Sequence, residues 1–187
     1  MAATINLYKT ENQIYKDFKG FVEVALSHFS ISGWDVKKLN QVIKSEELKP
    51  CIFIQILNKK QVGAEWRKNV KETDVDYTKK YYTRNEINIR FSAIRRRLIG
   101  DDTSTYNDID VLTLIRAYFQ TLNGISTFAA KSYAQYRASD VQVQSFTNDD
   151  ENVQLMPYFD CSYIYTDCYT NTINKIDYIR PKDIEGV

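Results

Sequence analysis

The sequence predicts an α+β protein, with a mixed or antiparallel sheet and helices packed on one face of it. Apolar residues recur at helical spacing across residues 14–29. They alternate with polar residues across 86–93, and an almost wholly apolar run fills 51–57. With 187 residues, no internal repeat and no low-complexity linker, the chain is most simply one domain, residues 1–187.

The N-terminal third predicts a helix followed by a buried strand. Thr10 and Gln13 have the spacing of a capping box, which starts an amphipathic helix ending near Phe29. A short helix or turn is expected over residues 34–43. Pro50 then opens a strand over 51–57, and its almost continuous apolar character favours a central position in the sheet.

Residues 58–84 predict a charged arm. The segment is polar, has Gly63 as its strongest turn signal, and is too long for a tight hairpin. We expect either a protruding β-arm, or long hairpin loop, or a mobile loop. Its few aliphatic residues cannot build a core of their own, so we predict that it becomes ordered on assembly.

The second half of the chain predicts further helices and strands. The alternating strand over 86–93 is buried on one face and should pair with the strand over 51–57. The remaining elements are expected to be a helix over 109–122 stopped by Asn123 and Gly124, a shorter helix over 126–136, and strands over 141–146, 159–165 and 175–179.

Charge is divided along the chain although the net charge is only +1. Residues 58–97 hold 12 Lys or Arg against five acids, and residues 98–187 hold six against 13. Such opposite regions suit docking between copies or attraction to a polyanion, or they neutralise each other within the fold. No apolar run reaches the roughly 20 residues of a membrane helix, so we expect no membrane partner and a cytosolic site of synthesis.

Catalytic and metal-binding patterns are missing from the sequence. A single His28 and the separated Cys51, Cys161 and Cys168 have no metal-ligand spacing, and we expect no metal, no cofactor and no enzymatic activity. One carboxylate cluster surrounds a predicted helix start, where capping is the favoured role and nuclease or glycosidase chemistry the alternative. Its members are Asp101, Asp102, Asp108 and Asp110.

Nucleic-acid binding is the alternative function from the residues alone. Basic and aromatic side chains interleave over residues 58–97, which would give phosphate contacts and stacking surfaces. The candidate phosphate contacts are Lys59, Lys60, Arg95, Arg96 and Arg97. A dedicated binder usually has a clearly basic net charge, which this chain lacks.

The order of elements resembles the tail-terminator or neck-terminator proteins of tailed bacteriophages. The resemblance rests on an N-terminal helix, the strand CIFIQIL leading to QVG, the strand EINIRFSAI, a helix pair, and the strand MPYFDCSYIY. It covers roughly residues 10–180. The length and charge of 58–84, and the sequence IRRR at 94–97 in place of a glycine turn, depart from the family's pattern.

This resemblance implies a structural virion protein rather than an enzyme. Members form a ring, usually a hexamer, that ends tail polymerisation and joins the tail tube to the head connector. The expected partners are therefore other copies, tube and connector proteins and, transiently, packaged DNA. The protein would lie in the virion tail or neck and assemble in the host cytoplasm.

The charge division predicts a head-to-tail contact in that ring, because a closed ring needs two different patches that fit each other. The basic middle of one copy, with Trp66 as an aromatic anchor, would meet the acidic C-terminal half of the next. The predicted interface residues are Trp66, Arg67 and Lys68 on one side and Asp149, Asp150, Tyr163 and Tyr165 on the other.

Overall fold

The computed structural model describes residues 9–39, 50–63, 66–72, 76–94, 106–147 and 153–174. These residues divide into two compact units, which are described separately. Unit 1 draws on the described residues within Met1–Lys9, Gln61–Asn85 and Thr166–Val187, and unit 2 on those within Thr10–Lys60 and Glu86–Tyr165. The single-domain organisation stays a prediction.

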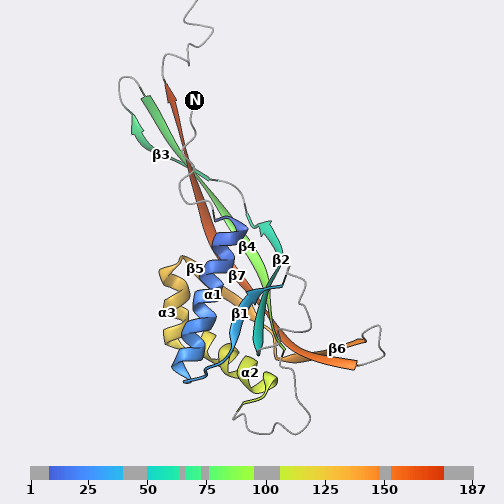
Figure 1. The fold of residues 1–187 in the computed structure, drawn as a ribbon. Helices are drawn as coiled ribbons and strands as arrows, with labels where there is room; N and C mark the ends of the chain where they lie inside the picture. The colour runs from blue at the N-terminus through green and yellow to red at the C-terminus, as the bar shows by residue number, and fades with distance from the viewer. Residues whose placement is uncertain are drawn as a thin grey trace, which may run out of the picture. The chain divides into compact units, whose positions relative to one another are not determined.

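The described residues form three helices and a seven-stranded mixed sheet, which confirms the α+β class (Figure 1). In chain order the elements are α1 (Glu11–His28), β1 (Asp35–Lys38), β2 (Cys51–Gln61), β3 (Trp66–Glu72), β4 (Asp76–Ile94), α2 (Asp108–Phe119), α3 (Leu122–Ala130), β5 (Tyr133–Ala138), β6 (Gln142–Thr147) and β7 (Val153–Asn174). The sheet order is β1-β2-β4-β7-β5, with β3 beside β4 and β6 beside β7. β1 is parallel to β2, whereas β3 pairs with β4, and β5 and β6 with β7, antiparallel.

The core of unit 2 lies between the helices and one face of the sheet (Figure 1). Every second residue of β4 from Ile87, and of β7 from Phe159 to Tyr165, is buried there, as the alternating pattern predicts. Phe18 of α1 is fully buried and has its ring centroid 4.8 Å from that of Tyr163 and 5.1 Å from that of Tyr133. These edge-to-face contacts join α1, β5 and β7 in one aromatic core.

Helix α1 begins as predicted, although only half of the capping box forms. The side chain of Thr10 accepts a hydrogen bond from the Gln13 backbone N–H at 3.2 Å. The Gln13 amide instead donates to Asp17, one turn further on, at 3.3 Å. The buried residues of α1 then repeat at helical spacing, which confirms the predicted amphipathic helix.

Strand β1 replaces the helix or turn expected over 34–43, of which residues 40–43 lie outside the described part of the chain. Asp35 pairs with Cys51 and Lys38 with Ile54, in parallel register. Val36 is the one buried residue of β1. The prediction was wrong because a four-residue strand with one apolar side chain carries no readable periodicity and depends on pairing with β2.

The α2–α3 junction corrects the predicted stop at Asn123 and Gly124. Helix α2 ends at Phe119, and the side chain of Thr121 caps a new helix by accepting from the Gly124 N–H at 3.1 Å. Gly124 lies inside α3 and packs directly on the backbone of Tyr118. The glycine thus serves a close approach between helices rather than a helix end.

The region after α3 was assigned partly to the wrong class. The predicted helix over 126–136 ends at Ala130, and Tyr133–Ala138 is strand β5, paired with β7. Strands β6 and β7 confirm the strands expected over 141–146 and 159–165. The strand expected over 175–179 lies outside the described residues.

The segment predicted as an arm contains β-structure in its described residues. It includes the end of β2, all of β3 and the start of β4. Within unit 1, Trp66 lies opposite Tyr82 and Arg67 opposite Tyr81 in the β3–β4 pair. This agrees with the β alternative of the prediction, while ordering on assembly stays a prediction.

Unit 1 contains a buried carboxylate with two donors. Asp167, only 3% exposed, accepts hydrogen bonds from the Lys9 backbone N–H at 3.0 Å and from the Asn85 side-chain amide at 2.9 Å. Asn85 is itself buried. Paired in this way, two buried polar side chains satisfy each other and tie Lys9 to β4 and β7.

Candidate interaction surfaces

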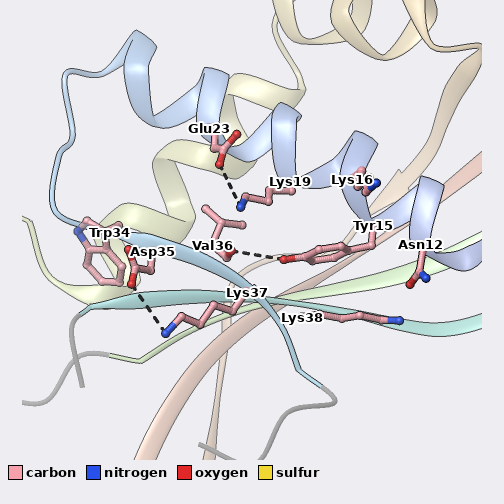
Figure 2. Close-up of a pocket in the computed structure, with 10 residues that line it drawn as sticks. All are labelled: Asn12, Tyr15, Lys16, Lys19, Glu23, Trp34, Asp35, Val36, Lys37 and Lys38. Atoms are coloured by element: carbon pink, nitrogen blue, oxygen red, sulfur yellow. Dashed lines mark hydrogen bonds and ion pairs between the residues drawn. The ribbon is translucent and has the colours of Figure 1, made fainter. Parts of the chain in front are cut away.

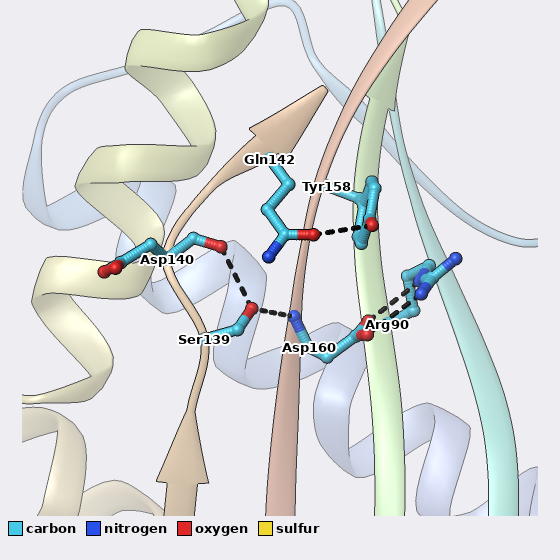
Figure 3. A network of polar contacts seen from close by, with 6 residues as sticks. All are labelled: Arg90, Ser139, Asp140, Gln142, Tyr158 and Asp160. Atoms are coloured by element: carbon cyan, nitrogen blue, oxygen red, sulfur yellow. Dashed lines mark hydrogen bonds and ion pairs between the residues drawn. The ribbon is translucent and has the colours of Figure 1, made fainter. Parts of the chain in front are cut away.

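The face of the sheet opposite the helices carries a network of polar side chains (Figure 3). Arg90 of β4 donates two parallel hydrogen bonds to Asp160 of β7, from Nε to Oδ1 at 2.8 Å and from Nη2 to Oδ2 at 2.9 Å. The Arg90 guanidinium also lies 4.0 Å from the centre of the Tyr158 ring. The hydrogen bonds to Asp160 raise the pKa of Arg90, so the guanidinium stays charged at neutral pH.

The network continues to the corner between β5 and β6. Ser139 and Asp160 bond reciprocally: the Asp160 N–H donates to Ser139 Oγ at 2.9 Å, and the Ser139 N–H donates to the Asp160 carbonyl at 2.8 Å. Arg116 of α2 donates to the Ser139 carbonyl and to the Asp140 carboxylate. Tyr158 donates to Gln142 at 2.7 Å. The corner is therefore fixed from two directions by side chains of α2 and β7.

A second polar link joins β7, β4 and β2. Ser162 of β7 donates to the Asn88 side-chain oxygen, and the Asn88 amide donates to Asn58 of β2 at 2.8 Å. Because each of these donors is hydrogen-bonded to an acceptor of the protein, the polar side chains on this part of the sheet have fixed positions.

A cleft of about 660 Å³ lies between α1 and β1 (Figure 2). Its lining includes the two aromatic side chains Tyr15 and Trp34 and the two carboxylates Glu23 and Asp35. It also includes four lysines, Lys16, Lys19, Lys37 and Lys38. The lining is therefore basic by two charges, and the cleft can hold an anionic group.

Two lysines of this cleft are held loosely by acidic neighbours. Lys19 lies 3.7 Å from Glu23 and Lys37 lies 3.8 Å from Asp35, each measured between nitrogen and carboxylate oxygen. All four of these side chains are more than 40% exposed. Ion pairs of this length and exposure stabilise by about 1 kcal/mol or less, so an incoming anion can replace them.

A smaller groove of about 450 Å³ lies beside α3 and β5. Its lining is mainly apolar and includes Ile125, Phe128 and Ala134. Ile125 is 48% exposed, and the neighbouring Leu122 is 83% exposed. Exposed apolar side chains at this edge of unit 2 are typical of a contact surface.

The predicted phosphate contacts have mixed positions. Lys59 and Lys60 are exposed at the end of β2. Lys60 pairs with Glu86 at 3.3 Å, and the Lys59 ammonium lies 5.3 Å from the centre of the Tyr165 ring. Arg95, Arg96 and Arg97 lie outside the described residues. The described residues therefore place only Lys59 and Lys60, and the role of all five residues stays a prediction.

The predicted subunit-interface residues are placed in three different ways. Tyr163 and Tyr165 are 0% and 1% exposed, packed against the helices in the core of their own chain. Trp66, Arg67 and Lys68 belong to β3. Asp149 and Asp150 lie outside the described residues. The two tyrosines are thus core residues in the subunit, because a tyrosine-rich alternating strand suits a buried face as well as an exposed one.

Of the four carboxylates near the start of α2, Asp110 takes part in capping. Asn107 and Asp110 form a reciprocal capping box: Asn107 accepts from the Asp110 N–H at 2.9 Å, and Asp110 accepts from the Asn107 N–H at 3.0 Å. Asp108 is the first residue of the helix, a position that the helix dipole favours for an acid. Asp101 and Asp102 lie outside the described residues.

Burial also accounts for the cysteines. Cys51, Cys161 and Cys168 are free and buried. Burial raises the pKa of the Cys51 thiol to about 11 and that of the Cys161 thiol to about 12, so both stay protonated at neutral pH. Cys51 and Cys161 therefore behave as small apolar side chains.

Sequence reasoning missed both the Arg90–Asp160 pair and the lysine cleft. Arg90 alternates with the buried residues of β4, which marks it as facing away from the helices, but nothing in the sequence names its partner 70 residues later. The spacing of Lys16 and Lys19 places them on one side of α1. That they line the same cleft as Lys37 depends on the position of strand β1, and the sequence did not predict this strand.

Comparison with known protein families gives the assignment. The profile described as E217 gateway protein gp29 matches residues 24–175, well over half of the chain. The chain belongs to this family. It is a bacteriophage family of the head–tail junction, so the gateway-family protein is a structural component of the virion neck. The prediction of a phage neck protein is thereby confirmed, while the terminator role and the hexameric ring stay predictions.

One curated protein resembles part of the gateway-family chain. It is the GTPase Era of Borrelia garinii subsp. bavariensis, 30% identical over 111 residues. The match covers 54% of this chain and 38% of that protein, so the chain spans well under half of its length.

Among the described residues, no helix is long and apolar enough to cross a membrane.

Proposed function

We propose that this gateway-family protein closes into a ring, a hexamer, at the head–tail junction of a tailed bacteriophage. The ring ends tail polymerisation and joins the tail tube to the head connector, and it acts without catalysis. Subunits fold and assemble in the host cytoplasm before the ring joins the virion. The family match over residues 24–175 is the observation that carries this proposal.

The organisation of unit 2 supports a role in assembly. The sheet order of the described strands begins at β1 and ends at β5, and each of these strands borders a concave surface. One surface is basic and the other mainly apolar. Two unlike surfaces on one chain are what a head-to-tail ring requires, because each copy must present a different patch to each neighbour.

Mass measurement tests the ring directly. The purified protein, alone and mixed with tail-tube protein or connector protein, is examined by native mass spectrometry and light scattering. We expect a closed oligomer of six copies, formed alone or on a partner ring. A protein that stays monomeric alone and with both partners would refute the proposed function.

Contact with packaged DNA is a secondary part of the proposal. Lys59 and Lys60 are exposed, but each already has an acidic or aromatic neighbour, which favours loose contact over a tight grip. A dedicated nucleic-acid-binding protein would instead bind duplex DNA tightly by itself, with affinity falling steeply as salt rises. Fluorescence titration between about 50 and 200 mM salt separates these two functions. The same preparation should cleave neither DNA nor nucleotides.

A further inference from the structure

Among the described strands, β1 ends the sheet order, and the lysine cleft lies between this end strand and α1. On the side facing β2, the Asp35 N–H donates to the Pro50 carbonyl at 2.9 Å and the Leu39 N–H to the Ile54 carbonyl at 3.2 Å. Residues of a strand alternate in the side to which their backbone groups point, so Val36 and Lys38 direct theirs away from β2. The Val36 carbonyl accepts from Tyr15 of α1 at 3.4 Å, across the cleft (Figure 2).

This combination selects an extended acidic peptide. Outward-facing backbone groups of an edge strand pair with an added strand, and lysines beside them attract carboxylates. Duplex DNA fits less well, because the cleft has the volume of a small-ligand pocket and its walls include the carboxylates Glu23 and Asp35. A peptide carboxylate can replace Asp35 on Lys37, whereas a duplex cannot reach the strand edge.

We propose that the cleft receives the acidic segment 149–151 of a second copy of this chain. Asp149, Asp150 and Glu151 are the only three consecutive acidic residues in the sequence, which makes them the densest match to the four lysines. The proposal rests on the proposed ring and names its contact. The cleft takes the place of Arg67 and Lys68 as the basic side of that contact.

Charge reversal tests this contact. The double variant Lys16→Glu/Lys37→Glu reverses two exposed cleft lysines and leaves the shorter Lys38–Glu11 pair, at 2.8 Å, intact. We expect ring formation to weaken about tenfold or more. Adding Asp149→Lys/Asp150→Lys to the same chain should restore much of it. The matched control, Arg67→Glu/Lys68→Glu, makes the same change in net charge and should assemble nearly as the wild type does.

Native mass spectrometry reads the assembly, and thermal melting of each variant checks its folding. If the glutamate variant does not fold, Lys16→Gln/Lys37→Gln replaces it, with the same expected direction. Unweakened rings in the cleft variant, or rings lost only in the Arg67/Lys68 control, would overturn the proposal and leave the ring itself standing. A wild type that never forms rings would remove the proposed function instead, and this inference with it.

Two further readouts exclude other occupants. If a fluorescent 20-base-pair duplex binds the wild type and the cleft variant loses that binding while its rings persist, the occupant is DNA and the proposal is wrong. If the cleft variant melts lower and the charge swap restores its melting temperature without any change in mass, the segment docks within its own chain. That result would also overturn the proposal.

Discussion

Gly124 provides the sharpest test of the packing between α2 and α3. A Cβ added at Gly124 would lie 2.2 Å from the carbonyl oxygen of Tyr118, far inside the 3.0 Å that real Cβ atoms keep. The obstacle is backbone, which cannot rotate away as a long side chain would. Thr121 adds to the constraint, because its N–H and its hydroxyl both donate to the same Tyr118 carbonyl.

We therefore expect Gly124→Ala to destabilise the protein by about 3 kcal/mol, the upper part of the usual range for overpacking. For a chain of this size that corresponds to a fall of about 6–12 °C in melting temperature. Gly20→Ala is the matched control. Gly20 lies in the middle of α1 with no atom within 4 Å of an added Cβ, so the same substitution should stabilise by about 0.5–1 kcal/mol.

Differential scanning calorimetry and urea denaturation of the two variants measure this contrast. Opposite signs are the essential result, since helix propensity alone would make both substitutions favourable. If Gly124→Ala melts at or above the wild-type temperature, α2 and α3 do not approach as described. The placement of α3 beside β5 would then fail as well.

Three further predictions concern other parts of unit 2. Arg90→Lys keeps the charge but loses the two-fold hydrogen bond to Asp160, and should cost about 1 kcal/mol in urea denaturation because the pair is partly exposed; equal stability would deny the pair any structural role. Thr10→Ala removes the α1 cap and should cost about 1 kcal/mol, with the loss of helix seen by circular dichroism on heating. The Cys51 and Cys161 thiols should react slowly with a disulfide reagent at pH 8 and quickly after unfolding; rapid reaction of the native protein would contradict their burial. Because the pKa values of both thiols are raised in the folded state, their contribution to stability should persist below about pH 9 and be lost as the pH rises through 11 and 12.

The elements that the sequence predicted well are those whose own residues carry a period. Helix α1 repeats its apolar side chains over five turns, and the second half of β4 alternates from Ile87 onward, so local pattern and tertiary burial agree. Strand β2 was read correctly from Cys51 because its first four residues are buried on both faces. Each of these patterns can be recognised in the sequence without knowing which element packs beside it.

The elements that were missed depend on partners distant in sequence. β1 and β5 are short end strands whose identity comes from pairing with β2 and β7. The break between α2 and α3 depends on Thr121, whose capping role is hidden inside a continuous apolar pattern. The lysine cleft was invisible for the same reason, since it exists only where α1 faces β1.

The two faces of the sheet in unit 2 divide folding from recognition. The face against the helices is filled by buried aromatic rings such as those of Phe18 and Tyr163. Because these side chains are buried within the subunit, they cannot contact a neighbouring copy. On the other face, Arg90 is already bound twice by Asp160 and covered by Tyr158. Two of its five N–H donors are thus used, and its guanidinium is fixed on the sheet rather than free to reach a partner. In the proposed ring we therefore expect a neighbouring copy to be bound at the sheet edges, where loosely paired lysines in the cleft beside β1 can exchange their acidic partners at little cost.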